Sequence, residues 1–140
     1  AVSDVSLSAD AERALVAAED ASARANVAIV SAEHLLGGAL LVLNELGGLS
    51  SPGSGQIEAA MRTSQGMGSE APAEKVMFGS AARAAMGFTA AVVRQQGGGE
   101  IDARVLAIGT IASDEVSPAF FESLGMTRHE LLVALQAFAN

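Results

Sequence analysis

The stretch LSADAERALVAAEDASARANVAIVSAEHLLGGAL, residues 7–40, decides the fold. Its apolar residues recur with the spacing of one helix face, and Ser8 and Ser31 stand where helix N-caps are preferred. The pattern predicts one helix over residues 8–25 and a second over residues 32–43. Small residues on the first helix indicate that it packs closely against a neighbour. The predicted inner faces are Ala11, Leu15, Ala18, Ser22 and Ala25, then Leu35, Leu36, Ala39, Leu40 and Leu43.

Further helices are predicted along the rest of the chain, separated by segments rich in Gly, Ser and Pro. Asp102 and Ser117 are expected N-caps, and Pro118 suits a first helical position. Thr127 with Glu130 three residues later forms a capping box. These helices are expected over residues 56–63, 80–96, 103–112, 118–124 and 128–138, with loops over 50–55 and 65–75.

Two halves of the chain repeat the same order of caps, long helix, break and second helix. Superposing residues 78–112 on residues 7–41 needs no gap, at an offset of 71. A tandem helical repeat is the economical interpretation. We therefore predict an all-α fold in one domain over residues 1–140, in which two repeats related by a pseudo-twofold axis share one core. Repeat one spans 7–63, a linker 64–77 and repeat two 78–139, with Phe78 on Leu7, Ala82 on Ala11, Met86 on Leu15, Leu106 on Leu35 and Gly109 on Gly38.

The composition excludes several classes of protein. The 140 residues carry a net charge of −8, half of them are apolar, and there are five Phe but no Trp, Tyr or Cys. Scattered acids argue against a nucleic-acid surface, and a chain without Cys has no disulfide or thiolate site. The longest apolar or Gly run, residues 35–43, is about half of the ~18 residues that a membrane span requires. We expect a cytoplasmic protein and, because the first residue is Ala1, one that was processed or cut from a longer chain.

Repeat one resembles the repeat of Clp N-terminal domains. That repeat has an aromatic residue or Leu, a Ser or Thr cap, Ala three residues later, and then a Thr-Glu-His-Leu-Leu-Leu-Gly block. This sequence departs from it in three ways: Ala32 replaces the Thr, Arg104 and Val105 replace the second Glu-His pair, and repeat one is shorter after Leu40. The resemblance covers nearly the whole chain and implies the same all-α bundle. Matching positions are Leu7, Ser8, Ala11, Leu15, Ala18, Glu33, His34, Leu35, Leu36 and Gly38, then Phe78, Ala82, Arg83, Met86, Ile101, Leu106, Gly109, Leu124 and Gly125.

The resemblance implies a binding role for Glu33 and His34. Clp N-terminal domains belong to AAA+ unfoldases, where they recruit substrate proteins and adaptors, and in some of them two glutamates recognise phosphorylated arginine. Glu33 could keep that role, because a carboxylate binds a guanidinium-like group well, whereas Arg104 would repel it. The plainer alternatives are that Glu33 is an acid in the first turn of a helix and that His34 is a hydrogen-bonded packing residue.

Phe78 and Arg83 are the other binding residues that the resemblance implies. Some actinobacterial relatives bind cyclic peptide antibiotics at the start of repeat two, where Phe78 would supply an apolar wall and Arg83 a cation. Gly87 stands where an acid is usual, which would weaken such binding. Alternatively, Phe78 is an ordinary core or helix-staple residue.

The sequence contains no enzymatic motif that we recognise. It has neither GxxxxGK[ST] nor GxSxG, and its two His lie 95 positions apart, so we expect no catalytic residue, metal or cofactor. We expect a monomeric, non-catalytic domain of the Clp protease system that binds substrate proteins, adaptors or peptides, cyclic peptide antibiotics included. It would be part of an unfoldase or a free-standing homologue that competes for the same ligands. The alternative is a helical protein that sequesters peptides or small molecules and has no part in proteolysis.

Overall fold

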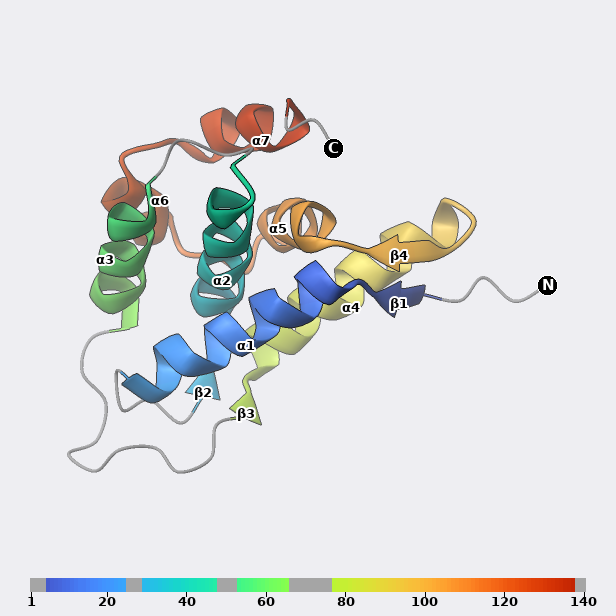
Figure 1. Cartoon of the computed structure of the whole chain (residues 1–140), viewed down its shortest axis with the longest axis horizontal. Coiled ribbons are helices and arrows are strands. Elements are labelled where there is room, and N and C mark those ends of the chain that lie inside the picture. Colours follow the sequence, from blue (N-terminus) through green and yellow to red (C-terminus); the bar gives the residue numbers. More distant parts are fainter. Residues whose placement is uncertain (1–4, 25–28, 48–52, 66–76, 138–140) are drawn as a thin grey trace.

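The chain folds into a bundle of helices joined by very short strands, which confirms the predicted all-α class (Figure 1). The computed structural model describes residues 5–24, 29–47, 53–65 and 77–137. None of the helices in these ranges is both long and apolar enough to cross a membrane. In chain order the elements are β1 (Val5–Leu7), α1 (Ala9–Arg24), β2 (Ile29–Val30), α2 (Ala32–Glu45), α3 (Ser54–Gln65), β3 (Met77–Phe78), α4 (Ser80–Gln95), β4 (Gly99–Ile101), α5 (Ala103–Ala112), α6 (Pro118–Leu124) and α7 (Arg128–Gln136).

Short strands that the sequence pattern did not predict tie the two repeats together. β1 pairs with β4 and β2 pairs with β3, both in parallel, so each ribbon takes one strand from each repeat. The Ser8 N–H donates to the Ile101 carbonyl at 2.9 Å, and the Gly79 N–H donates to the Val30 carbonyl at 2.9 Å. These two bonds are equivalent at the offset of 71 residues. Strands of two or three residues are too short to leave an alternating pattern in the sequence.

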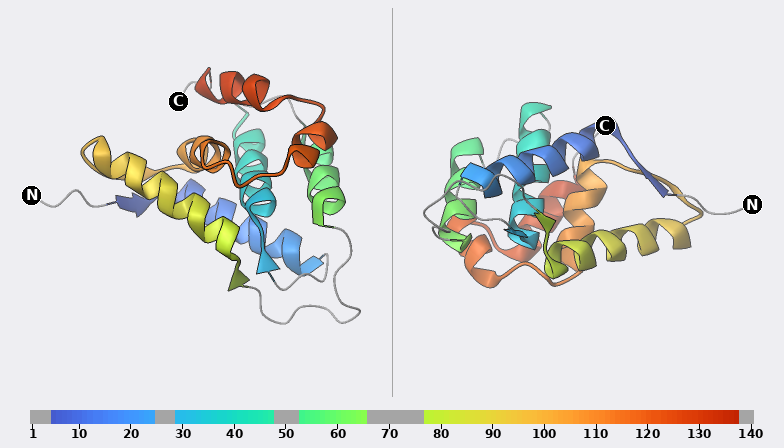
Figure 2. Two further views of the ribbon diagram at one scale, coloured as in Figure 1. Left: turned by 180° about the vertical axis from the view of Figure 1, so that it is seen from behind. Right: turned by 90° about the horizontal axis from the view of Figure 1, so that it is seen from below.

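The helices follow the same offset. α1 and α4 both have 16 residues, and their first residues lie 71 positions apart, as do the first residues of α2 and α5. α2 and α5 pack against each other, α1 packs on α2, and α4 packs on α5 (Figures 1 and 2). α3 packs on α2 and α6, and α7 packs on α5. This arrangement fits the predicted pseudo-twofold repeat.

Small residues let the crossing helices approach closely. A Cβ added to Gly38 of α2 would lie 2.9 Å from the backbone nitrogen of Ala18 on α1. A Cβ added to Gly109 of α5 would lie 2.7 Å from the Cβ of Thr89 on α4. The two crossings are equivalent in the two repeats, so the glycine at this position of each repeat is explained by close helix packing.

Some helix limits and faces differ from the sequence prediction. α3 begins two residues earlier, at Ser54, because the Oε1 of Gln56 accepts the Gly53 N–H at 3.1 Å and closes the first turn. α2 runs two residues past its predicted end, and α7 stops two residues short. On α1, Ala14 is fully buried, whereas Leu15 of the predicted face is only partly buried.

The division into repeats and linker stays a prediction. Residues 66–76 of the predicted linker lie outside the described residues, as do Ala25 at the end of the first predicted helix and residues 50–52 of the first predicted loop.

Candidate functional site

The β2–β3 ribbon brings together the two helix starts that carry the sequence-predicted residues. Val30 and Phe78 are partners in the register of that ribbon. Val30 leads into α2, which carries Glu33 and His34, and Phe78 leads into α4, which carries Arg83. The starts of α2 and α4 therefore lie near each other, although they are far apart in the sequence.

Glu33 binds the backbone of repeat two. Its side chain is buried, with a residue exposure of 9%, and its Oε2 accepts the N–H of Ser117 at 2.7 Å. Ser117 is the N-cap of α6, but its hydroxyl makes no capping bond. A carboxylate is favourable at a helix N-terminus, so Glu33 supplies to α6 what the predicted serine cap does not.

Arg104 occupies the position in repeat two that is equivalent to Glu33. Its Nε donates to the carbonyl of Leu135 at 2.8 Å, and its Nη2 donates to the carbonyl of Gln136 at 3.4 Å. Both carbonyls belong to the last turn of α7, where a cation is favourable. Glu33 and Arg104 thus each carry the charge that suits the helix end that they contact.

His34 is enclosed at the start of α2. It is 1% exposed, and its Nδ1 lies 3.2 Å from the Oγ of Ser31, which also caps the helix by accepting the backbone N–H of His34 at 3.2 Å. Burial lowers the pKa of the His34 ring, and the charge of Glu33 partly opposes this shift. A neutral packing residue accounts for these contacts. Within the described residues, no group of three His, Cys, Asp or Glu could hold a metal ion.

Phe78 and Arg83 are the more accessible of the predicted residues. Phe78 is half-buried and packs against the edge of the core, whereas Arg83 is exposed on the first turn of α4. Gly87, one turn further along, is exposed and has open space where a side chain would project. An apolar wall and a cation are therefore available to a ligand here, without the acid that the family pattern would add.

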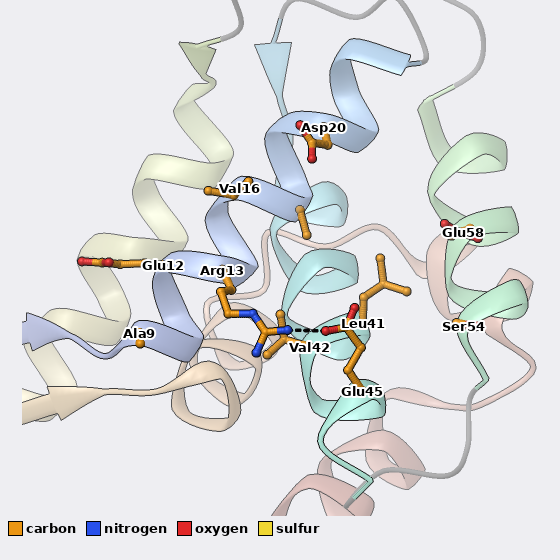
Figure 3. Close-up of a pocket in the computed structure, with 11 residues that line it drawn as sticks. Ala9, Glu12, Arg13, Val16, Asp20, Leu41, Val42, Glu45, Ser54 and Glu58 are labelled. Atoms are coloured by element: carbon orange, nitrogen blue, oxygen red, sulfur yellow. Dashed lines mark hydrogen bonds and ion pairs between the residues drawn. The ribbon is translucent and has the colours of Figure 1, made fainter.

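A groove that the sequence did not predict lies between α1, the second half of α2 and α3 (Figure 3). Its volume is about 690 Å³, and none of Glu33, His34, Phe78 and Arg83 lines it. One feature of the sequence indicates part of this groove. Val16 lies four residues from both Glu12 and Asp20, so an apolar side chain and two acids share one face of the first helix. The remaining walls come from other helices and need the tertiary fold. The charged residues that line the groove are Glu12, Arg13, Asp20, Glu45 and Glu58.

A second groove, of about 510 Å³, lies where α5 leads into α6 and α7. Arg128 closes one side of it, since its Nη1 donates to the Oδ1 of Asp114 at 2.6 Å and its Nη2 to the carbonyl of Ile111 at 2.9 Å. Asp114 has a φ of 65°, in the left-handed region, which an aspartate tolerates better than most residues. These contacts explain the turn after α5 without a ligand.

Comparison with known proteins identifies the fold. The N-terminal domain of the caseinolytic protease associated chaperone ClpD from Arabidopsis thaliana has a TM-score of 0.74 to this chain at 16% sequence identity. The match covers 93% of this chain and 94% of that chain. No family model matches the sequence, and no curated protein matches it. The chain has the fold of a Clp N-terminal domain, which confirms at the level of fold the resemblance seen in its repeats.

Proposed function

We propose that this chain is a non-catalytic docking domain of the Clp protease system, which binds substrate proteins, adaptors or peptides. The observation that carries the proposal is the fold likeness to a Clp chaperone N-terminal domain over nearly the whole length of both chains. The accessible Phe78 and Arg83 beside the β2–β3 ribbon support it. The domain acts in the cytoplasm as a monomer, either within an unfoldase or as a free-standing homologue that competes for the same ligands.

A competition assay tests the docking role. The chain is added in excess to a purified Clp unfoldase with its protease, and the degradation of an adaptor-dependent substrate is followed. The rate should fall, because the chain and the unfoldase would bind the same adaptor or substrate. An unchanged rate, with no heat of binding to adaptor or substrate in calorimetry, would contradict the proposal. Peptide binding without any effect on degradation would favour a sequestering protein instead.

The proposal assigns Phe78 and Arg83 to a cyclic peptide site. A cyclic peptide antibiotic at 100 times its Kd should stabilise the chain by about 2.7 kcal/mol and raise the Tm accordingly. Arg83→Ala should reduce this rise, whereas Arg94→Ala, which removes an exposed arginine from the other end of α4, should leave it unchanged. If the wild-type Tm does not rise, the peptide site is wrong and the docking role for proteins is tested separately by the competition assay.

The proposal also gives Glu33 a part in recognising phosphoarginine, in competition with its bond to Ser117. Glu33→Gln keeps an oxygen that can accept the Ser117 N–H but loses the charge, whereas Glu33→Ala loses both. If Glu33 binds the ligand, calorimetry should detect phosphoarginine binding to the wild type and none to either variant. Glu33→Ala should in addition lower the free energy of unfolding by about 1–3 kcal/mol, because it leaves the Ser117 N–H without its acceptor. Equal affinity of wild type and Glu33→Gln would exclude the ligand role.

A further inference from the structure

The groove between α1, α2 and α3 lies apart from the helix starts that carry Phe78 and Arg83. We infer that this groove binds a basic segment of a partner protein, in which arginine or lysine alternates with apolar side chains. The inference rests on the proposed docking role and names the chemistry of the partner.

The groove offers apolar surface to such a segment. Val16 on α1 is 55% exposed, and Leu41 on α2 is partly buried (Figure 3). Ala9, Ala17 and Val42 complete the apolar part of the lining. Covering this surface with a partner's apolar side chains would remove it from water, which is the main source of affinity in protein docking.

The rim of the groove is acidic. Among the described residues that line the groove, the charged groups are four carboxylates, from Glu12 and Asp20 on α1, Glu45 at the end of α2 and Glu58 on α3, and the guanidinium of Arg13. Arg13 is already paired with Glu45 (Figure 3). The lining therefore has an excess of negative charge, and a concave surface of one sign concentrates ligands of the opposite sign.

The equivalent helix of repeat two lacks the acids of α1. At the offset of 71 residues, Gly87 stands in place of Val16 and Ala91 in place of Asp20, while Arg83 stands in place of Glu12. The second repeat makes the same helices without these acids, so the fold does not require them, although Phe88, which stands in place of Ala17, keeps apolar surface exposed there. The two repeats thus present different surfaces to partners.

Charge also decides between the possible occupants of the groove. The chain carries a net charge of −8, so a second copy would approach the acidic rim against electrostatic repulsion. A basic segment would be attracted to the same rim. A groove of about 690 Å³ is large enough to enclose several side chains of such a segment.

A binding experiment with matched variants tests the inference. The probe is a short synthetic peptide in which Arg alternates with Leu, and its affinity for the full chain is measured by fluorescence anisotropy at low and at physiological salt. The double variant Asp20→Asn, Glu58→Gln removes two carboxylates from the groove. The control Glu19→Gln, Glu100→Gln removes two carboxylates that do not line it. Thermal unfolding of every variant confirms that it is folded.

We expect the wild type and the control to bind the peptide with similar affinity, and the groove variant to bind it about fivefold or more weakly. Affinity should fall as salt is added. Val16→Ser should also weaken binding, as should Ser in place of Leu or Glu in place of Arg in the peptide.

Equal weakening in the groove and control variants would mean that the peptide senses only net charge, which would overturn the inference. Self-association in analytical ultracentrifugation that the groove variant abolishes would assign the groove to a second copy and would overturn it as well. Neither result affects the outcome of the Clp competition assay. The two experiments therefore distinguish a wrong inference about the groove from a wrong proposal of the docking role.

Discussion

At the scale of single residues, His34 couples the stability of the fold to pH. The residue is 1% exposed, and burial lowers the pKa of its ring from the ordinary value of 6.5, against the opposing charge of Glu33. The unfolded chain takes up a proton near that ordinary value, whereas the folded chain takes it up only at lower pH. The stability that the neutral ring contributes is therefore complete above pH 6.5 and is lost as the pH falls through the lowered pKa.

We predict that the free energy of unfolding falls as the pH is lowered from about 7 to about 5, and falls less steeply in His34→Gln than in the wild type. Urea denaturation at a series of pH values measures how the free energy of unfolding changes with pH in each protein. A loss of packing in the variant lowers this free energy at every pH, so it does not change the slope. An equal slope in His34→Gln and the wild type would contradict the prediction.

At the scale of elements, α2 crosses α1 at Gly38 and α5 crosses α4 at Gly109, and the two glycines face different kinds of atoms. Gly38 faces the backbone of α1 at Ala14 and Ala18, which cannot move aside, whereas Gly109 faces the side chain of Thr89. Gly38→Ala should therefore destabilise the chain by about 1–3 kcal/mol or more in urea denaturation. Gly109→Ala should do the same, but adding Thr89→Ala should recover much of that loss.

The variant Gly87→Ala is the control for this pair, because Gly87 is exposed on α4 with open space around it. It should stabilise the chain by about 0.5–1 kcal/mol, the usual advantage of Ala over Gly in a helix. Recovery of Gly38→Ala by a change elsewhere in α1, or no recovery of Gly109→Ala by Thr89→Ala, would contradict the account of the two crossings.

The elements were predictable from sequence where local chemistry determines them. Ser31, Asp102 and Thr127 cap α2, α5 and α7 through bonds to residues three positions ahead, so the spacing alone predicts these helix starts. The contact of Glu33 with Ser117 joins residues 84 positions apart, and nothing local predicts it. The groove is likewise missed because its walls belong to three helices. The resemblance predicted the fold, but the contacts of Glu33 and Arg104 needed the structure.

At the scale of the whole molecule, the two repeats are linked by pairs of strands, each pair with one strand from each repeat. β1 of repeat one pairs with β4 of repeat two, and β3 of repeat two pairs with β2 of repeat one. α2 packs directly on α5, and the core is formed by buried residues of both repeats. Neither repeat can bury its inner face or pair its strands without the other, so we expect the chain to unfold as one cooperative unit.

Two fragments, divided within residues 66–76, test this cooperativity. Each fragment alone should show weak helical circular dichroism and no sharp thermal transition, because the strands and the α2–α5 contact lack their partners. Mixing the fragments should restore helicity and a single transition whose midpoint rises with concentration, since the complex of fragments assembles by mass action. The intact chain should give coincident transitions by circular dichroism and by hydrogen exchange of α1 and α4 amides. A sharp transition in either fragment alone would mean that the repeats are separate domains, and the prediction of one domain would then be wrong.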